Sequence, residues 1–447
     1  MIINIPMNED IEKFFLERGC LVEEKAIEEI NRRGGMDYVL KNEKRFDFSS
    51  PIIAVSNLPA VNEFSIVKEF HLDGYPGISE SFVDMFRSRY QFLHARLNER
   101  SRNRFFLPVS KLKRENGTVF ASGMVVEFNE SKRGYRIVEM EDESTTIKVI
   151  LPRTFKEVII RDEVIGVSGQ FSKDGTAIFA ESIYRPEVSR EQERKGSSVN
   201  VMVISDIHVG SKNFIEDSFL NMVDYVNSHG IAFVIMNGDL VDGIGVYPDQ
   251  EADLAIEDIN LQYKKLADLI SRFNRNVKVI LIPGNHDIVY PTEPQNPLPK
   301  EINALFPPNV ISLSNPVWVE IGERIFLLYH GTSIFDFLEA IPGMTLNDTD
   351  KVMVEMLKRG HLAPEYGKNL SFIPLKKDYY LIDPVPDVLI TGHVHSHSVT
   401  TYRGILAINA STFQEQTNYQ RMMNFNPKPA IGTVVNTYDL STTVVRF

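Results

Sequence analysis

The chain has 447 residues, about three times the ~150 residues of a typical domain, and its 43% hydrophobic and 24% charged residues exclude a disordered or fibrous protein. Its single cysteine, Cys20, excludes an internal disulfide, and the absence of a ~20-residue apolar run or a signal peptide predicts a cytoplasmic protein that contacts no membrane. The net charge of −12 argues against general nucleic-acid binding, but residues 1–200 contain 30 basic and 32 acidic residues, so most of the negative charge lies in residues 201–447.

Two short amphipathic helices are expected at the start of the chain, over residues 8–18 and 22–33. Their apolar residues recur at helical spacing, at Ile11, Phe14, Phe15, Ala26, Ile27 and Ile30. A pair of glycines ends the second helix, and the mixed, proline-punctuated stretch 42–63 indicates a linker. We therefore assign residues 1–75 to a helical N-terminal region and its linker.

A longer helix is expected over residues 79–97. One of its sides is apolar, with Phe82, Phe86, Tyr90, Leu93 and Leu97. The segment 87–114 contains nine basic residues and one acid, Glu99, so its net charge is +8. This charge fits a solvated helix face, or alternatively a positive edge that attracts the DNA backbone. The candidate DNA contacts in the second case are Arg100, Arg102 and Arg104. We assign residues 76–114 to a basic helical connector.

The hydrophobic period changes to two between residues 115 and 190. Five short apolar segments alternate there with turns such as Asn116-Gly117. Five strands in roughly 70 residues suit a small barrel of the oligonucleotide/oligosaccharide-binding (OB) type, and another small β-sandwich is the alternative. The polar, charged stretch 189–198 then marks a domain boundary.

Five near-continuous apolar runs in residues 199–447 predict strands buried on both faces. A polar motif follows each run, and the five motifs contain Asp206 and His208; Asp239; Asn285, His286 and Asp287; His330; and His393 and His395. Open α/β sheets place their sites beyond the carboxyl ends of the strands. Each motif alone could be a turn or a pair of surface histidines, but five of the ten histidines of the chain lie at these strand ends. The combination predicts a metal site.

The candidate ligands are two Asp, one Asn and four His, and none of them is Cys. This set excludes thiolate zinc and iron–sulfur sites and favours divalent ions held by imidazole and carboxylate groups. Seven ligands are too many for one ion with an open position. They suit two ions that share a carboxylate, about 3.5–4 Å apart, as in sites that clamp a phosphoryl group.

In this order, the motifs D-x-H, GD, GNHD, H and GHxH resemble the signature of the calcineurin-like metallophosphoesterases, whose fold is a two-layer β-sandwich flanked by helices. The resemblance implies a first ion held by Asp206, His208 and His395, a second held by Asn285, His330 and His393, and Asp239 as the bridging ligand. It also implies that His286 contacts the scissile phosphate as general acid or charge stabiliser and that Asp287 orients His286. A hydroxide at the ions would attack the phosphorus.

Three further stretches, 238–251, 359–367 and 418–435, resemble the small subunits of the archaeal family D DNA polymerases. These proteins are related to the B-subunits of the eukaryotic replicative polymerases, and they place an OB barrel before the phosphoesterase domain. The expected fold is therefore a mixed α/β chain: a phosphoesterase sandwich over residues 199–447, preceded by an OB barrel over residues 115–190 and by the small helical region.

The eukaryotic relatives have lost metal ligands, whereas every ligand position is filled in this sequence. The resemblance thus implies a metal-dependent 3′–5′ exonuclease with two divalent ions, and Mn²⁺ is the expected metal. It also implies proofreading of single-stranded or mismatched 3′ ends of DNA, in complex with a large catalytic subunit. A non-catalytic assembly subunit and a stand-alone phosphodiesterase for small substrates are the alternatives.

Several residues near these motifs are expected to lie outside the ligand set. Asp242 is expected to shape a loop or to support a ligand, and His397 to lie exposed or behind the ligands. His361 could contact DNA near the site or be structural. The aromatic residues expected in the core or at an interface are Phe413, Tyr419, Phe425 and Trp318. The segment 418–430 is expected to contact the large subunit.

Overall fold

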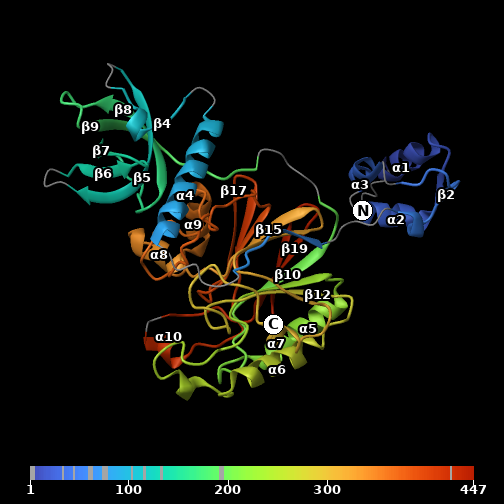
Figure 1. Ribbon diagram of the computed structural model, residues 1–447. Coiled ribbons are helices and arrows are strands. Elements are labelled where there is room, and N and C mark those ends of the chain that lie inside the picture. The colour runs from blue at the N-terminus through green and yellow to red at the C-terminus, as the bar shows by residue number, and fades with distance from the viewer. Residues whose placement is uncertain are drawn as a thin grey trace.

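The fold is described from a computed structural model of the chain (Figure 1). The structure describes residues 6–32, 35–43, 46–58, 64–72, 79–101, 104–113, 117–130, 134–190, 196–422 and 425–447. Within these ranges, the helices are too short or too polar to cross a membrane.

Two six-stranded sheets form the centre of the molecule (Figure 1). The first has the order β13-β12-β11-β10-β19-β20, with the bounds Val310–Ser312, Lys278–Ile282, Phe233–Asn237, Asn200–Ile204, Ile431–Asn436 and Thr442–Arg446. The second has the order β17-β18-β16-β15-β14-β3, with the bounds Ser398–Tyr402, Ile405–Asn409, Val388–Thr391, Arg324–Leu328, Val317–Ile321 and Phe64–Lys68. In the first sheet, the neighbours from β10 to β13 run parallel.

Apolar side chains fill the space between the two sheets. Val203 and Ile280 of the first sheet belong to one buried cluster with Phe326 and Ile390 of the second. The outer faces are covered by helices: α5, α6 and α7 (Glu216–Ser228, Ile259–Ile270, Lys300–Asn303) on the first sheet, and α8 and α9 (Ile334–Ala340, Thr349–Arg359) on the second. Burial on both faces is the reason why the strands read as unbroken apolar runs. The predicted fold class, a two-layer β-sandwich flanked by helices, is confirmed.

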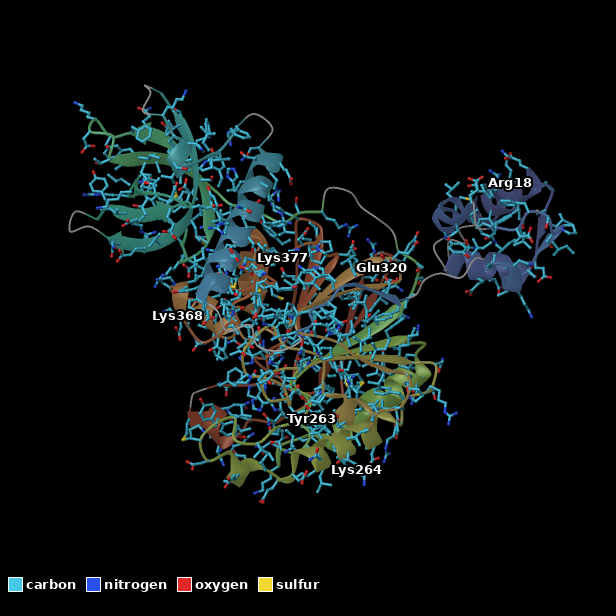
Figure 2. The ribbon with its side chains drawn as sticks, in the orientation of Figure 1. Arg18, Tyr263, Lys264, Glu320, Lys368 and Lys377 are labelled. Carbon is cyan, nitrogen blue, oxygen red and sulfur yellow. The ribbon has the colours of Figure 1, made fainter. Side chains whose placement is uncertain are left out.

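The covering helix α6 is amphipathic. Its N-terminus is capped by Asp258, whose carboxylate accepts hydrogen bonds from two backbone N–H groups of the first turn. Tyr263 faces the sheet and is buried, whereas its neighbour Lys264 is exposed to solvent (Figure 2). The Tyr263 hydroxyl donates to the Asp287 carboxylate at 2.8 Å, so this helix also supports a loop that carries predicted site residues.

A closed five-stranded barrel precedes most of the strands of the sandwich in the sequence. Its strands β5, β6, β7, β8 and β9 have the bounds Val119–Glu130, Arg136–Glu141, Thr146–Leu151, Val164–Phe171 and Ala177–Tyr184, and the two-residue β4 (Leu107–Pro108) pairs with β5. The order is β5-β6-β7-β9-β8, and β8 pairs back with β5, which closes the sheet. Only β7 and β9 run parallel among these five strands. The prediction of an OB-type barrel is confirmed, and the alternative of a small sandwich is wrong.

The N-terminal helices have a hydrophobic core of their own. The helices α1, α2 and α3 have the bounds Pro6–Leu16, Glu24–Arg32 and Met36–Asn42, and the two-residue strands β1 (Leu21–Val22) and β2 (Ile52–Ile53) pair in parallel. The buried cluster runs from Ile11 to Leu58 and takes no residue from the barrel or the sandwich. The two predicted helices are present, whereas the seven-residue α3 was too short to be predicted from its pattern.

The strand β3 lies within residues 1–75, which we assigned to the helical region and its linker. It pairs antiparallel with β14 at the edge of the second sheet, and Phe64 lies opposite Ile321. Part of this range therefore belongs to the sandwich, and the barrel is inserted between two parts of it. The strand gave a weak sequence signal because it is short and half-exposed at a sheet edge, with Ile66 and Val67 open to solvent.

The helix α4 (Ser79–Arg100) joins the barrel to the sandwich (Figure 1). Its buried residues Tyr90, Leu93 and Leu97 form one cluster with barrel residues and with Leu381 of the sandwich. Arg89, in the basic segment 87–114, is not solvated: its side chain is 1% exposed, and its Nε donates to Asp378 at 2.6 Å. A second buried ion pair, between Glu163 of the barrel and Arg359 of α9 at 2.9 Å, also joins the two parts.

Replacing Arg89 by methionine is expected to destabilise the sandwich by about 3–5 kcal/mol, because the buried Asp378 carboxylate loses its cationic partner. The matched control is Arg87→Met on the same helix, where the side chain is 44% exposed; a change below about 1 kcal/mol is expected there. The only tryptophan of the chain, Trp318, is buried in the second sheet, so its fluorescence during denaturant unfolding reports on the sandwich. Equal unfolding midpoints for the two variants would contradict this expectation.

Candidate metal centre

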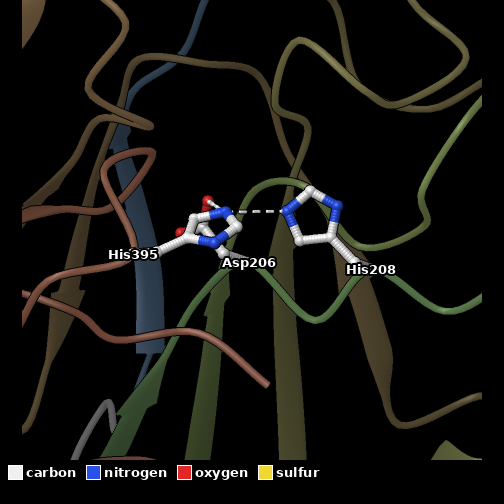
Figure 3. A group of neighbouring side chains, drawn as sticks. All are labelled: Asp206, His208 and His395. Atoms are coloured by element: carbon white, nitrogen blue, oxygen red, sulfur yellow. Dashed lines mark hydrogen bonds and ion pairs between the residues drawn. The ribbon is translucent and has the colours of Figure 1, made fainter. Parts of the chain in front are cut away.

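The loops that follow β10, β11 and β12 in the first sheet and β15 and β16 in the second meet at one edge of the sandwich. These loops carry all five predicted motifs. Figure 3 shows Asp206 and His208, which follow β10, beside His395, which follows β16. Residues that are almost 200 positions apart in the sequence are thus brought into contact because the strands before them end at the same edge.

The first group of ligand atoms comes from Asp206, His208 and His395. The Nε2 atoms of His208 and His395 are 3.0 Å apart, and His395 Nε2 is 3.4 Å from Asp206 Oδ1. Ligands at ~2.0–2.2 Å from one ion, with angles near 90–109°, lie ~2.9–3.5 Å from one another. The three atoms therefore have the spacing of neighbouring ligands around one ion.

The second group comes from Asp239, His330, His393 and Asn285. His330 Nε2 is 3.3 Å from Asp239 Oδ2 and 3.2 Å from Asn285 Oδ1, and a ring nitrogen of His393 lies within 4.8 Å of ligand atoms of both Asp239 and His330. Asp239 Oδ2 is also 3.8 Å from His208 Nε2, so this carboxylate lies between the two groups. The structure thus brings all seven predicted ligands together, with Asp239 in the position of a bridge.

Two ligand atoms are buried without a hydrogen bond among the residues that the structure describes. They are Asp206 Oδ1 and His393 Nδ1. A buried polar atom without a partner costs about 1–3 kcal/mol, and proteins keep such atoms where a ligand or ion satisfies them. Together with the imidazole and carboxylate donor set, these atoms fit divalent metal ions.

The ligand-bearing loops have an unusual backbone. Asp206, His208, Asp239, His393 and His395 all adopt a left-handed conformation, with φ between 43° and 67°. Such residues cost about 1–3 kcal/mol each and concentrate at functional sites. A Cβ atom at Gly284 would collide with the Asp239 carboxylate, so glycine is required there for the close approach of the two loops.

Neighbouring polar groups hold the imidazole rings in place. His208 Nδ1 donates to the Asp242 carboxylate at 3.0 Å, and His330 Nδ1 donates to the Asn237 carbonyl at 3.0 Å, which leaves both Nε2 atoms facing the centre. Asp242 also accepts from Gln414 at 2.9 Å. The expectation that Asp242 supports a ligand agrees with these contacts.

The charges of the centre are strongly coupled. Burial alone would raise the pKa of Asp239, but the neighbouring histidines, His330 first among them, hold it well below its usual range. Burial alone would lower the pKa of His330, but the Asp239 charge raises it to about 10. The Asp239 carboxylate is therefore ionised at neutral pH, as a bridging ligand must be.

The candidate general acid, His286, lines a cavity of about 440 Å³ together with four of the predicted ligands. Its Nδ1 donates to the backbone carbonyl of Asp242 at 2.7 Å, and its Nε2 is 4.0 Å from Asp239 Oδ2. The prediction that Asp287 orients His286 is wrong. The Asp287 carboxylate instead accepts from Tyr263 and from the backbone N–H groups of Leu240 and Gly284, because the turn after β12 directs it away from the cavity.

The candidate DNA contacts have different environments. Arg100 donates to the Glu187 carbonyl, and Arg104 is exposed with its guanidinium 4.9 Å from the Tyr184 ring; both line a second cavity of about 600 Å³ beside the barrel. Arg102 lies outside the described residues. His361 is 1% exposed and bonded to Asp378 at 2.9 Å, so a DNA contact from this position is excluded.

The segment 414–425 contributes more to the centre than its sequence indicated. Phe413 and Trp318 are buried in the core, as expected. In contrast, Tyr419 and Phe425 line the cavity, and the Gln420 side chain lies 3.0 Å from His395 Nδ1. Tyr419, Gln420 and Phe425, which belong to the segment expected only to contact a partner, therefore also line the cavity.

The chain is similar to several known proteins. Residues 201–400 match the family model of the B-subunits of DNA polymerases alpha and epsilon. The chain is similar to the DNA polymerase II small subunit of Thermoplasma acidophilum, with 41% identity over 82% of this chain and 78% of the relative. It is also similar to that of Methanothermobacter thermautotrophicus, with 33% identity over 96% and 98%. Among solved structures, an archaeal phosphodiesterase aligns with 56% of this chain and 100% of its own, at 12% identity and a TM-score of 0.30.

Proposed function

Because the chain belongs to the family of archaeal DNA polymerase small subunits, we propose that it is a metal-dependent 3′–5′ exonuclease that removes mismatched nucleotides for a large catalytic subunit. The observation that supports this activity best is that the seven predicted ligands meet at one edge of the sandwich, where four of them line one cavity together with His286. A purely structural metal site would need neither His286 nor open space beside the ligands.

We propose two divalent ions, with Mn²⁺ as the first metal to test. When bound, they would polarise the phosphate oxygens and lower the pKa of a water molecule at the site. The ligands would be Asp206, His208 and His395 for one ion, Asn285, His330 and His393 for the other, and Asp239 for both.

In the proposed reaction, the role of the protein side chains is to transfer a proton, and His286 is the residue that does so. The Nδ1 atom of His286 is engaged with the Asp242 carbonyl, so Nε2 is the atom that can face the phosphate. When His286 is protonated, this nitrogen donates its proton to the 3′ oxygen that leaves as the P–O3′ bond breaks. Asp242 thus positions both His208, through its carboxylate, and His286, through its backbone carbonyl.

The experiment uses the full-length chain, alone and with its large subunit, on 5′-labelled single strands and on primers with a mismatched 3′ end. We expect stepwise shortening from the 3′ end with Mn²⁺ and none with EDTA. A complex that binds DNA but never shortens it would support the non-catalytic assembly subunit. Rapid turnover of a cyclic nucleotide that DNA does not inhibit would support the small-substrate phosphodiesterase.

A further inference from the structure

Aromatic rings surround the metal centre. Phe335 lies 5.3 Å from the His393 ring, Phe425 lies 5.9 Å from the His395 ring, and Tyr247 lies 6.3 Å from the His286 ring, all between ring centroids. These three residues and Tyr419 line the same 440 Å³ cavity as the ligands. These four residues come from three separate segments of the chain, which together give the cavity an aromatic rim.

The cavity wall provides no permanent positive charge. Among the residues that the structure describes, neither Lys nor Arg lines it, whereas Asp239, Asp242 and Glu339 do. Apart from any bound metal ions, the histidines are therefore the groups of this wall, within the described residues, that can attract a phosphate. The rest of a bound nucleotide has to be held by apolar and stacking contacts.

Tyr419 is the ring best placed for such a contact. It stacks on Tyr247, with centroids 5.2 Å apart and planes 26° apart, and it is still 41% exposed. Stacked aromatic rings lie about 4.5–7 Å apart, so no base fits between these two, and a base can stack only on the open side of Tyr419. Tyr247 is itself fixed, because its hydroxyl donates to Asp253 at 3.2 Å.

The helix that carries Tyr419 is tied to the metal centre. Tyr419 lies on α10 (Asn418–Met422), next to Gln420, whose amide nitrogen is 3.0 Å from His395 Nδ1. The Gln420 backbone N–H and side-chain oxygen also bond with Thr417. These hydrogen bonds hold the helix that carries Tyr419 beside His395.

We propose that Tyr419, backed by Tyr247, stacks on the unpaired nucleobase at the 3′ end of a DNA strand whose last phosphodiester lies at the metal centre. This inference rests on the proposed exonuclease and specifies its substrate as a nucleotide with a free base face. A stacking contact accepts all four bases, since each has an aromatic face, and this suits an enzyme that removes any mismatched nucleotide.

The test compares Tyr419→Ala with Tyr419→Phe, which keeps the ring. Met422→Ala is the matched control, because Met422 lies on the same helix and is 79% exposed. Each variant of the full-length chain receives two oligonucleotides that differ only at the 3′ end, one with a normal nucleotide and one with an abasic residue. The readouts are KM and kcat for cleavage, Kd from fluorescence anisotropy in an added His286→Ala background, and metal content.

For the normal end, Tyr419→Ala should raise KM and Kd about 5- to 150-fold, the range of a lost base–aromatic stack, with kcat nearly unchanged. For the abasic end, which has no base to stack, Tyr419→Ala should change neither KM nor Kd by more than about 2-fold. Tyr419→Phe and Met422→Ala should behave like the wild type, and all variants should keep their metal.

Equal losses on both oligonucleotides, or no loss on either, would overturn the stacking proposal while leaving the exonuclease intact. A wild-type chain that cleaves no DNA would instead contradict the proposed function. In that case the comparison of Kd values still decides whether Tyr419 stacks on a base.

Discussion

Replacing His286 by alanine is expected to lower the cleavage rate about 10²–10⁴-fold, the usual contribution of general acid–base catalysis, while metal content stays unchanged. The reason is that His286 lines the cavity, with its Nε2 4.0 Å from Asp239 Oδ2, but is not among the seven proposed ligands. The measurement is the single-turnover rate on a DNA strand, with metal content by mass spectrometry. His229→Ala, at an exposed position after α5, is the control and should be inert.

A second substrate distinguishes the two roles considered for His286. A phosphodiester with a p-nitrophenolate leaving group needs no protonation as the bond breaks. If His286 is the acid, its loss should slow this substrate far less than DNA. Equal slowing of both substrates would assign it to charge stabilisation, and loss of metal from His286→Ala would contradict both roles.

Replacing Asp239 by asparagine is expected to abolish activity and to reduce metal content by more than one ion per chain. Its Oδ2 atom lies 3.3 Å from His330 Nε2 and 3.8 Å from His208 Nε2, so both groups of ligands lose their only shared negative charge. The matched comparison is Asp242→Asn, which removes only the carboxylate behind His208. There the affinity for metal should fall about 10- to 100-fold, without loss of the second ion. Identical metal titrations for the two variants would contradict a bridging role of Asp239.

The residues that gather at the candidate metal centre could be predicted from the sequence because they follow strands that are themselves easy to recognise. Once the strands are placed, the topology of an open sheet brings their ends together. What the sequence could not provide is the direction of each side chain after the turn. Asp287 is adjacent to His286 in sequence, but its carboxylate accepts from Tyr263, and the residue that holds the His286 ring is Asp242, through its backbone carbonyl.

Two other features depended on tertiary packing that no local pattern reveals. Arg89 has the sequence context of a solvated arginine, yet its guanidinium is buried because Asp378, almost 300 residues later, lies beside it. Tyr419 has the context of an ordinary apolar loop residue, yet Gln420 holds it at the cavity. In both cases a contact with a distant part of the chain decides the environment: Asp378 for Arg89, and Tyr247, on which the ring stacks, for Tyr419.

The pairing of β3 with β14 also affects how the protein is made. About 250 residues separate the two strands, so at about 5–20 residues per second the ribosome needs roughly 12–50 s after β3 emerges before its partner exists. The barrel, whose strands are all local to one another, can close during that interval. A truncated chain that begins after residue 75 would lack β3, so the edge of β14 would be open to pairing with other chains. A truncated chain that begins at Phe64 would keep β3, and that edge would stay covered.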